Sequence, residues 1–205
     1  MSTVVIGGHS RNVGKTSVVA GLIAALREFD WTAVKITQFG HGVCSVNGES
    51  CACATDEHMW SVSEERDAAS GKDTARYLAA GAKRSLWVRT KQGRLAEAMP
   101  DLRRELVGAV NVIIESNSVL RFLRPELYLT VLDPSTADFK ESSREFLDRA
   151  DAVLLHAGDG AARNAAQWER VSLKPVAERP VFRIVPPEYV TAEVVEFVRR
   201  RLAPG

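Results

Sequence analysis

The amino-acid sequence predicts an α/β fold in which a doubly wound, mostly parallel β-sheet carries helices on both faces. Short apolar runs rich in Val, Ile and Leu recur along the 205 residues, as is typical of buried parallel strands. Segments with helical spacing of apolar residues separate several of these runs, and this alternation favours parallel strands joined by crossover helices. The length suits one domain, so we expect a single domain over residues 1–205.

The strands are expected where these apolar runs fall. They are 4–6, 32–36, 86–89, 112–114, 127–132, 152–155 and 181–185. The first helix is expected at about 18–29, where apolar residues recur at i, i+4 spacing. Further helices are expected at 73–82, 95–107, 137–150 and 192–202, the second of these with an interruption near Pro100.

One stretch, from about residue 38 to residue 71, shows neither a convincing strand pattern nor a long helix pattern. It contains all three cysteines of the chain. A loop of this length inside a compact domain is usually functional or disordered. We therefore expect a cysteine-containing insertion after the second strand, too small to form a separate domain.

The composition excludes several classes of protein. The chain is 45% hydrophobic and 26% charged, which is enough apolar material for a core. Its net charge of +1 argues against a polybasic nucleic-acid binder. No apolar run approaches the ~18–20 residues that cross a bilayer, and no secretory signal follows Met1. With an odd number of cysteines as well, we expect a reducing, cytoplasmic setting and neither nucleic acid nor a membrane as partner.

The strongest functional motif joins the first predicted strand to the first predicted helix. Residues 7–17 read Gly-Gly-His-Ser-Arg-Asn-Val-Gly-Lys-Thr-Ser. Glycines let backbone N–H groups converge on phosphate oxygens, and the N-terminus of the helix adds its partial positive charge. The motif therefore predicts a phosphate-binding loop. The residues expected to bind nucleotide there are Gly8, Asn12, Val13, Gly14, Lys15, Thr16 and Ser17.

Two side chains of this loop are expected to carry chemistry. Lys15 is placed to reach the terminal phosphates and to stabilise charge during phosphoryl transfer, and the Thr16 hydroxyl is placed to coordinate Mg²⁺. His9 stands where the motif G-x-x-x-x-G-K-[ST] has its first glycine, so Gly8 leads and the loop is one residue longer. These features predict a P-loop NTPase that binds GTP or ATP together with Mg²⁺.

The longer loop resembles that of dethiobiotin synthetase and its relatives in the SIMIBI class of P-loop NTPases. A resemblance to MobB, the adaptor family of molybdopterin-guanine dinucleotide biosynthesis, covers more of the chain, roughly residues 3–118. It rests on Val-Lys-Ile-Thr-Gln-Phe-Gly-His-Gly at 34–42 and on Gly-Lys-Asp-Thr-Ala-Arg with Ala-Gly-Ala at 71–82. The chain departs from the family at Thr37 and Gln38, where MobB has His-His, and at Ser116, where it has Gly.

This resemblance implies a slow GTP or ATP hydrolase that assists cofactor maturation or metal delivery. It also implies a homodimer formed across the nucleotide and a cofactor-biosynthesis protein as partner. Two alternatives stay open. One is an ATP-dependent ligase or kinase similar to dethiobiotin synthetase, and the other is a metal-binding regulatory module without turnover.

A carboxylate is expected beside the metal. Glu115 follows the apolar run 112–114, and a carboxylate at the carboxyl end of a core strand of such a sheet lies near the Mg²⁺. Glu115 is therefore predicted to act catalytically, by holding the metal through water or by orienting the nucleophile, unless it is a surface residue. Asn117 is a further candidate for this site, whereas Asp73 is expected to cap the helix 73–82.

Recognition of the base is the least specific signal. Asp159 follows the run 152–155 at the offset of the Asp in the Asn-Lys-x-Asp motif of GTPases, but the Asn and Lys are absent. Asp159 either reads guanine or belongs to a Gly-Asp-Gly turn. The sequence therefore leaves the choice between GTP and ATP open.

The cysteine segment concentrates soft ligands within 18 residues, namely His41, Cys44, Cys51, Cys53 and His58. Thiolates and imidazoles bind Zn²⁺ or hold an Fe–S cluster. The spacing matches no standard C-x₂-C pattern. A loop with free thiols, or a Cys51–Cys53 pair formed on oxidation, is the alternative to a metal site.

Overall fold

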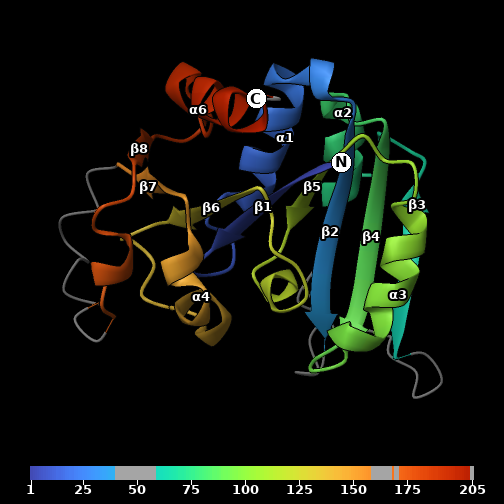
Figure 1. Ribbon diagram of the computed structural model, residues 1–205, viewed down its shortest axis with the longest axis horizontal. Helices are drawn as coiled ribbons and strands as arrows, with labels where there is room; N and C mark the ends of the chain where they lie inside the picture. Colours follow the sequence, from blue (N-terminus) through green and yellow to red (C-terminus); the bar gives the residue numbers. More distant parts are fainter. Residues whose placement is uncertain (40–58, 158–167, 169–170, 204–205) are drawn as a thin grey trace.

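The computed structural model describes residues 1–39, 59–157, 168 and 171–203. Eight strands in this part of the chain form one sheet in the order β3-β4-β2-β5-β1-β6-β7-β8 (Figure 1). All neighbouring strands are parallel except β3 and β4. The strands are β1 (Ser2–Gly8), β2 (Trp31–Phe39), β3 (Trp60–Glu65), β4 (Arg84–Lys91), β5 (Asn111–Glu115), β6 (Leu127–Leu132), β7 (Ala152–His156) and β8 (Val181–Ile184).

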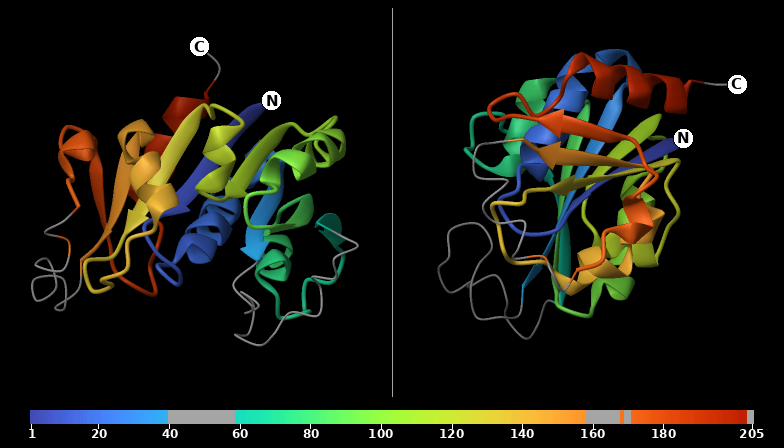
Figure 2. Two further views of the ribbon diagram at one scale, coloured as in Figure 1. Left: turned by 90° about the horizontal axis from the view of Figure 1, so that it is seen from below. Right: turned by 90° about the vertical axis from the view of Figure 1, so that its left-hand side faces the viewer.

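Helices cover both faces of the sheet, as the sequence predicts. One face carries α1 (Lys15–Ala25), α2 (Asp73–Ala80) and α6 (Ala192–Leu202), and the other carries α3 (Leu95–Glu105) and the short α4 (Glu141–Glu145). Short 3₁₀ turns complete the described elements, namely η1 (Arg27–Phe29), η2 (Ser118–Arg121), η3 (Leu147–Arg149) and η5 (Lys174–Val176). Figure 2 shows the strands fanning between the two helical layers.

Two apolar clusters, one on each face, hold these layers together. Successive residues of a strand point to opposite faces, so Val4 and Ile6 belong to the cluster that includes α1 and α6, whereas Val5 belongs to the cluster on the face that carries α3. The doubly wound, mostly parallel α/β fold is therefore confirmed. Among the described helices, none is long and apolar enough to cross a membrane.

The expectation of an unstructured stretch over 38–71 is wrong in part. β2 extends to Phe39, and residues 60–65 form β3, an edge strand that pairs antiparallel with β4. Trp60 and Val62 are its only large apolar residues and pack against the core from the α3 face. Two alternating apolar residues are too few to predict a strand from the sequence. The strand instead depends on its pairing with β4.

Two helix expectations also need correction. The helix expected at 137–150 is reduced to α4 and η3, although its buried residues have helical spacing: Lys140 is extended, with its N–H bonded to the His9 carbonyl, and the backbone leaves the α conformation at Phe146. The helix expected at 95–107 is not interrupted near Pro100: α3 runs from Leu95 to Glu105 with Pro100 inside it. Its buried face, formed by residues such as Met99 and Leu102, offsets the hydrogen bond that the proline removes.

The topology places the predicted functional segments together. Because β1, β2, β5 and β6 are parallel neighbours, the residues that follow them meet at one edge of the sheet. This carboxyl edge collects the predicted phosphate loop, the end of β5 and the segment 133–140 after β6. Binding sites of open α/β sheets occur at such an edge.

Candidate functional site

The predicted phosphate loop leaves β1 and turns directly into α1. Asn12, with φ 57°, and Gly14, with φ 87°, both adopt left-handed backbone conformations, and Gly14 is the N-cap of α1. The ring of Tyr189 covers Gly14 so closely that a Cβ there would lie 2.1 Å from Tyr189 Cε1. Glycine is therefore required at position 14 by both the backbone conformation and the close approach.

Two side chains fix the loop against the neighbouring strands. Asn117, just after β5, donates from Nδ2 to the Gly8 carbonyl at 2.8 Å and accepts at Oδ1 from the Gly8 N–H at 2.9 Å. His156, the last residue of β7, donates from Nε2 to the Val13 carbonyl at 3.0 Å. The structure thus gives Asn117 a role in holding the start of the loop.

The Lys15 side chain folds back over the loop residues that precede it. Its ammonium donates to the Ser10 carbonyl at 2.5 Å, and its stem runs along Gly8. Burial lowers the pKa of Lys15 to about 8, and the charge of Glu115 opposes this effect. The loop therefore holds a partly desolvated ammonium ion, and a bound anion would compensate for this desolvation.

This low pKa predicts a pH dependence of nucleotide binding. The free protein loses the Lys15 proton above about pH 8, whereas a bound phosphate would keep the ammonium charged, so binding must take up a proton. In the absence of Mg²⁺, we expect the affinity for a nucleoside triphosphate to fall about tenfold from pH 7 to pH 9. Equilibrium titrations at both values measure this, and Lys15→Arg should flatten the profile. An affinity of the wild type that does not change with pH would contradict the prediction.

Thr16 and Glu115 meet at the end of β5. The Thr16 hydroxyl donates to Glu115 Oε2 at 2.8 Å, and the buried Tyr77 of α2 donates its hydroxyl to the same oxygen. Glu115 is only 7% exposed, so it is not a surface residue. The predicted phosphate loop and this carboxylate therefore lie together at the carboxyl edge of the sheet.

Lys35 is a functional candidate that the sequence analysis did not identify. Its ammonium lies 3.2 Å from Glu115 Oε1, forms a second ion pair with Asp73 and lies 3.3 Å from Thr16 Oγ1. It is the one charged residue within the apolar run 32–36. That exception to a buried pattern was the available signal, because a buried lysine requires acidic partners.

Asp73 has a different role from the expected one. The N-cap of α2 is Lys72, and no side chain caps the helix. The Asp73 carboxylate instead pairs with Lys35. A turn organised around Glu65, the last residue of β3, positions Asp73. Glu65 Oε2 accepts hydrogen bonds from Ser70 Oγ and Thr74 Oγ1, each at 3.1 Å.

The donor groups of this site fit Mg²⁺. Thr16, Glu115 and Asp73 supply hard oxygen ligands, which Mg²⁺ prefers. No group of three or more His, Cys, Asp or Glu side chains with metal-binding geometry occurs in the part of the chain that the structure describes. Mg²⁺ does not need such a cage, because it is commonly held by one or two carboxylates, waters and substrate phosphates.

The predicted site residues not yet placed are Ser17 and the candidates for binding a soft metal or the nucleotide base. Ser17 Oγ accepts from Arg76 Nη2 of α2 at 3.0 Å, which ties α1 to α2 beside the loop. The remaining candidates, namely His41, Cys44, Cys51, Cys53, His58 and Asp159, lie outside the described residues.

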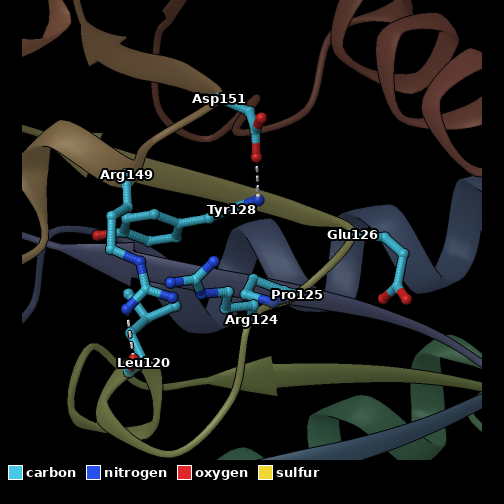
Figure 3. A pocket seen from close by; sticks show the side chains of 7 residues that line it. All are labelled: Leu120, Arg124, Pro125, Glu126, Tyr128, Arg149 and Asp151. Carbon is cyan, nitrogen blue, oxygen red and sulfur yellow. Dashed lines mark hydrogen bonds between the residues drawn. The ribbon is translucent and has the colours of Figure 1, made fainter.

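A cavity of about 430 Å³ lies at the opposite, amino edge of the sheet (Figure 3). Its polar groups are largely engaged within the protein. Arg149 donates to the carbonyls of Leu120 and Leu123, and Asp151 accepts from the Tyr128 N–H at 2.8 Å. This cavity is therefore separate from the phosphate loop.

This fold is known from other proteins. The chain has the doubly wound α/β fold of P-loop NTPases, with a glycine-rich loop between β1 and α1. No family model matches the sequence, and no curated protein matches it.

Solved structures with related folds have low sequence identity to this chain. The "apo" form of LpxK from Aquifex aeolicus in complex with ATP is 16% identical, with a TM-score of 0.50 over 89% of this chain and 53% of LpxK. HypB from Helicobacter pylori in complex with nickel is 16% identical, with a TM-score of 0.48 over 97% of this chain and 84% of HypB. The signal recognition particle receptor FtsY from Elizabethkingia anophelis in complex with GDP is 17% identical, with a TM-score of 0.45 over 100% of this chain and 64% of FtsY. This chain spans about half of LpxK, and the likeness concerns the fold alone.

Proposed function

We propose that this protein binds a purine nucleoside triphosphate with Mg²⁺ and cleaves its terminal phosphate bond. The observation that carries the proposal is the 2.8 Å contact between Thr16 Oγ1 and the buried Glu115 carboxylate, directly beside the phosphate loop. It supports the proposal because a hydroxyl and a carboxylate that could hold Mg²⁺ lie beside Lys15, which would reach the phosphates. Backbone N–H groups of the loop would bind the phosphate chain, and Lys15 would stabilise charge on the transferred group.

Each remaining group has a defined role in this proposal. Mg²⁺ would supply charge neutralisation of the phosphates. Tyr77 and Lys35 hold the Glu115 carboxylate in place, and Asn117 fixes the loop to β5. The finer proposal, from the resemblance to MobB, is a GTP or ATP hydrolase that works as a homodimer in cofactor maturation or metal delivery.

Lys35 favours a second candidate function, transfer of the phosphate to an acidic acceptor. Like the Lys15 ammonium, the Lys35 ammonium lies at the carboxyl edge of the sheet, and it pairs with the two carboxylates proposed to bind the metal. A carboxylate or carbamate substrate could bind there, as in a ligase similar to dethiobiotin synthetase.

Phosphate release tests both functions. Purified protein with Mg²⁺ and either ATP or GTP should release phosphate slowly, and no release from either nucleotide, with or without an added small carboxylic acid, would contradict both functions. Release that rises only when a small carboxylic acid is added, together with a new acid product, would support the ligase over the hydrolase.

A further inference from the structure

The segment 133–140, which follows β6, is fastened to the beginning of the phosphate loop. The Lys140 N–H donates to the His9 carbonyl at 2.8 Å, and His9 Nδ1 donates to the Asp138 carbonyl at 2.8 Å. The Ser10 hydroxyl donates to Asp138 Oδ2 at 2.7 Å. These three bonds fix the backbone of Lys140 relative to the loop.

Aromatic packing strengthens this attachment. The His9 ring is fully buried and contacts the rings of Phe139 and Trp168, with centroids 5.1 Å and 4.8 Å away. Burial lowers the pKa of His9, and Nδ1 carries the proton in this hydrogen bond because the Asp138 carbonyl can only accept. The attachment is therefore a packed element, and Lys140 cannot move far from the loop.

The Lys140 ammonium is half-buried and forms no ion pair within the described residues. Burial and the neighbouring charge of Arg11 lower its pKa, and Lys140 in turn lowers the pKa of Lys15. Lys35 and Glu115 also act on it electrostatically. The Lys140 ammonium therefore lies close enough to the two lysines and the carboxylate of the site for their charges to act on one another.

The charges beside the loop are incomplete without an anion. Lys15 and Lys35 are matched by Glu115 and Asp73, so these four groups bring no net charge. On the other side of the loop, neither Arg11 nor Lys140 forms an ion pair within the described residues: the Asp138 carboxylate accepts from Ser10, and Asp133, at the start of the same segment, acts on His9. A Mg²⁺-bound triphosphate keeps a net negative charge, and its terminal phosphate would lie beyond Lys15 on this side.

We propose, on the basis of the proposed function, that Lys140 contacts the terminal phosphate of the bound nucleotide and gives the site its preference for triphosphates over diphosphates. The lysine acts from within the same chain, in a position that a diphosphate does not reach. This role explains why the Lys140 ammonium lies half-buried without an ion pair among the described residues, since the cost of such burial is offset when an anion binds.

The test compares the affinities of a non-hydrolysable triphosphate and of the corresponding diphosphate, both with Mg²⁺. Lys140→Ala should weaken triphosphate binding about tenfold or more and leave diphosphate binding within about twofold, because one charged contact is lost. Lys140→Arg should keep most of the preference. Lys174→Ala, at an exposed lysine of η5, is the matched control and should change neither affinity.

The other outcomes overturn the inference. Equal losses for both nucleotides would give Lys140 a role in shaping the loop, and unchanged affinities would give it no role in binding. Thermal unfolding of Lys140→Ala identifies a folding defect, and Lys140→Gln, which keeps the stem, then repeats the comparison. If the wild type binds neither nucleotide, the proposed function itself fails; if binding requires Lys15 but not Lys140, only this inference fails.

Discussion

Replacement of Lys15 by alanine should reduce the affinity for a Mg²⁺-triphosphate by at least about 100-fold. The substitution removes a buried ammonium that would donate to the phosphates. Hydrogen bonds between a charged donor and a charged acceptor are stronger than those between neutral groups. The melting temperature should not fall, because the variant also removes the cost of burying an ammonium. Calorimetric titration of the wild type and Lys15→Ala measures the difference.

The control for Lys15→Ala is Lys174→Ala, which removes an exposed lysine far along the chain. This variant should bind the nucleotide as the wild type does. If Lys15→Ala bound the triphosphate with unchanged affinity, the loop would not be the phosphate site. If both lysine variants lost affinity equally, the effect would reflect net charge.

The second large effect is expected for Glu115→Gln. Glutamine keeps the size of the side chain and an oxygen that can accept from Thr16, but it removes the charge that would hold Mg²⁺. We expect Mg²⁺-dependent phosphate release to fall about 100-fold or more, and nucleotide affinity without Mg²⁺ to change by less than about threefold. Steady-state release and titration in a chelator give the two values.

A matched control for this variant is Glu97→Gln, at a half-buried residue of α3 that pairs with Arg94. Its rate should equal that of the wild type. Unaltered phosphate release by Glu115→Gln would show that this carboxylate only neutralises Lys35. A large loss of Mg²⁺-free affinity would instead indicate that the substitution disturbs the loop.

The central strands and the loop could be predicted because their signals are local. The run 112–114 is apolar throughout, as a strand covered on both faces must be, and β5 forms there. The sequence of the phosphate loop likewise contains the glycine that its left-handed turn into α1 requires. β3 could not be predicted in this way, since its two core residues acquire meaning only beside β4.

Much of the candidate site depends on contacts between distant segments. Lys35 and Asp73 form their ion pair across 38 residues, and Asn117 reaches Gly8 across 109. No spacing rule reports such a contact. Lys35 offered a partial signal as a charge within a buried strand, whereas Lys140 offered none, because its place beside the loop follows from the order of β1 and β6 in the sheet.

The most direct measurement of the central claim is the ³¹P NMR spectrum of a Mg²⁺-triphosphate titrated with this protein. If the loop binds the polyphosphate chain, the β- and γ-phosphate resonances should shift or broaden until one nucleotide per chain is bound, and Lys15→Ala should abolish the change. Phosphate resonances of both ATP and GTP that stay unperturbed by excess wild-type protein would contradict the account.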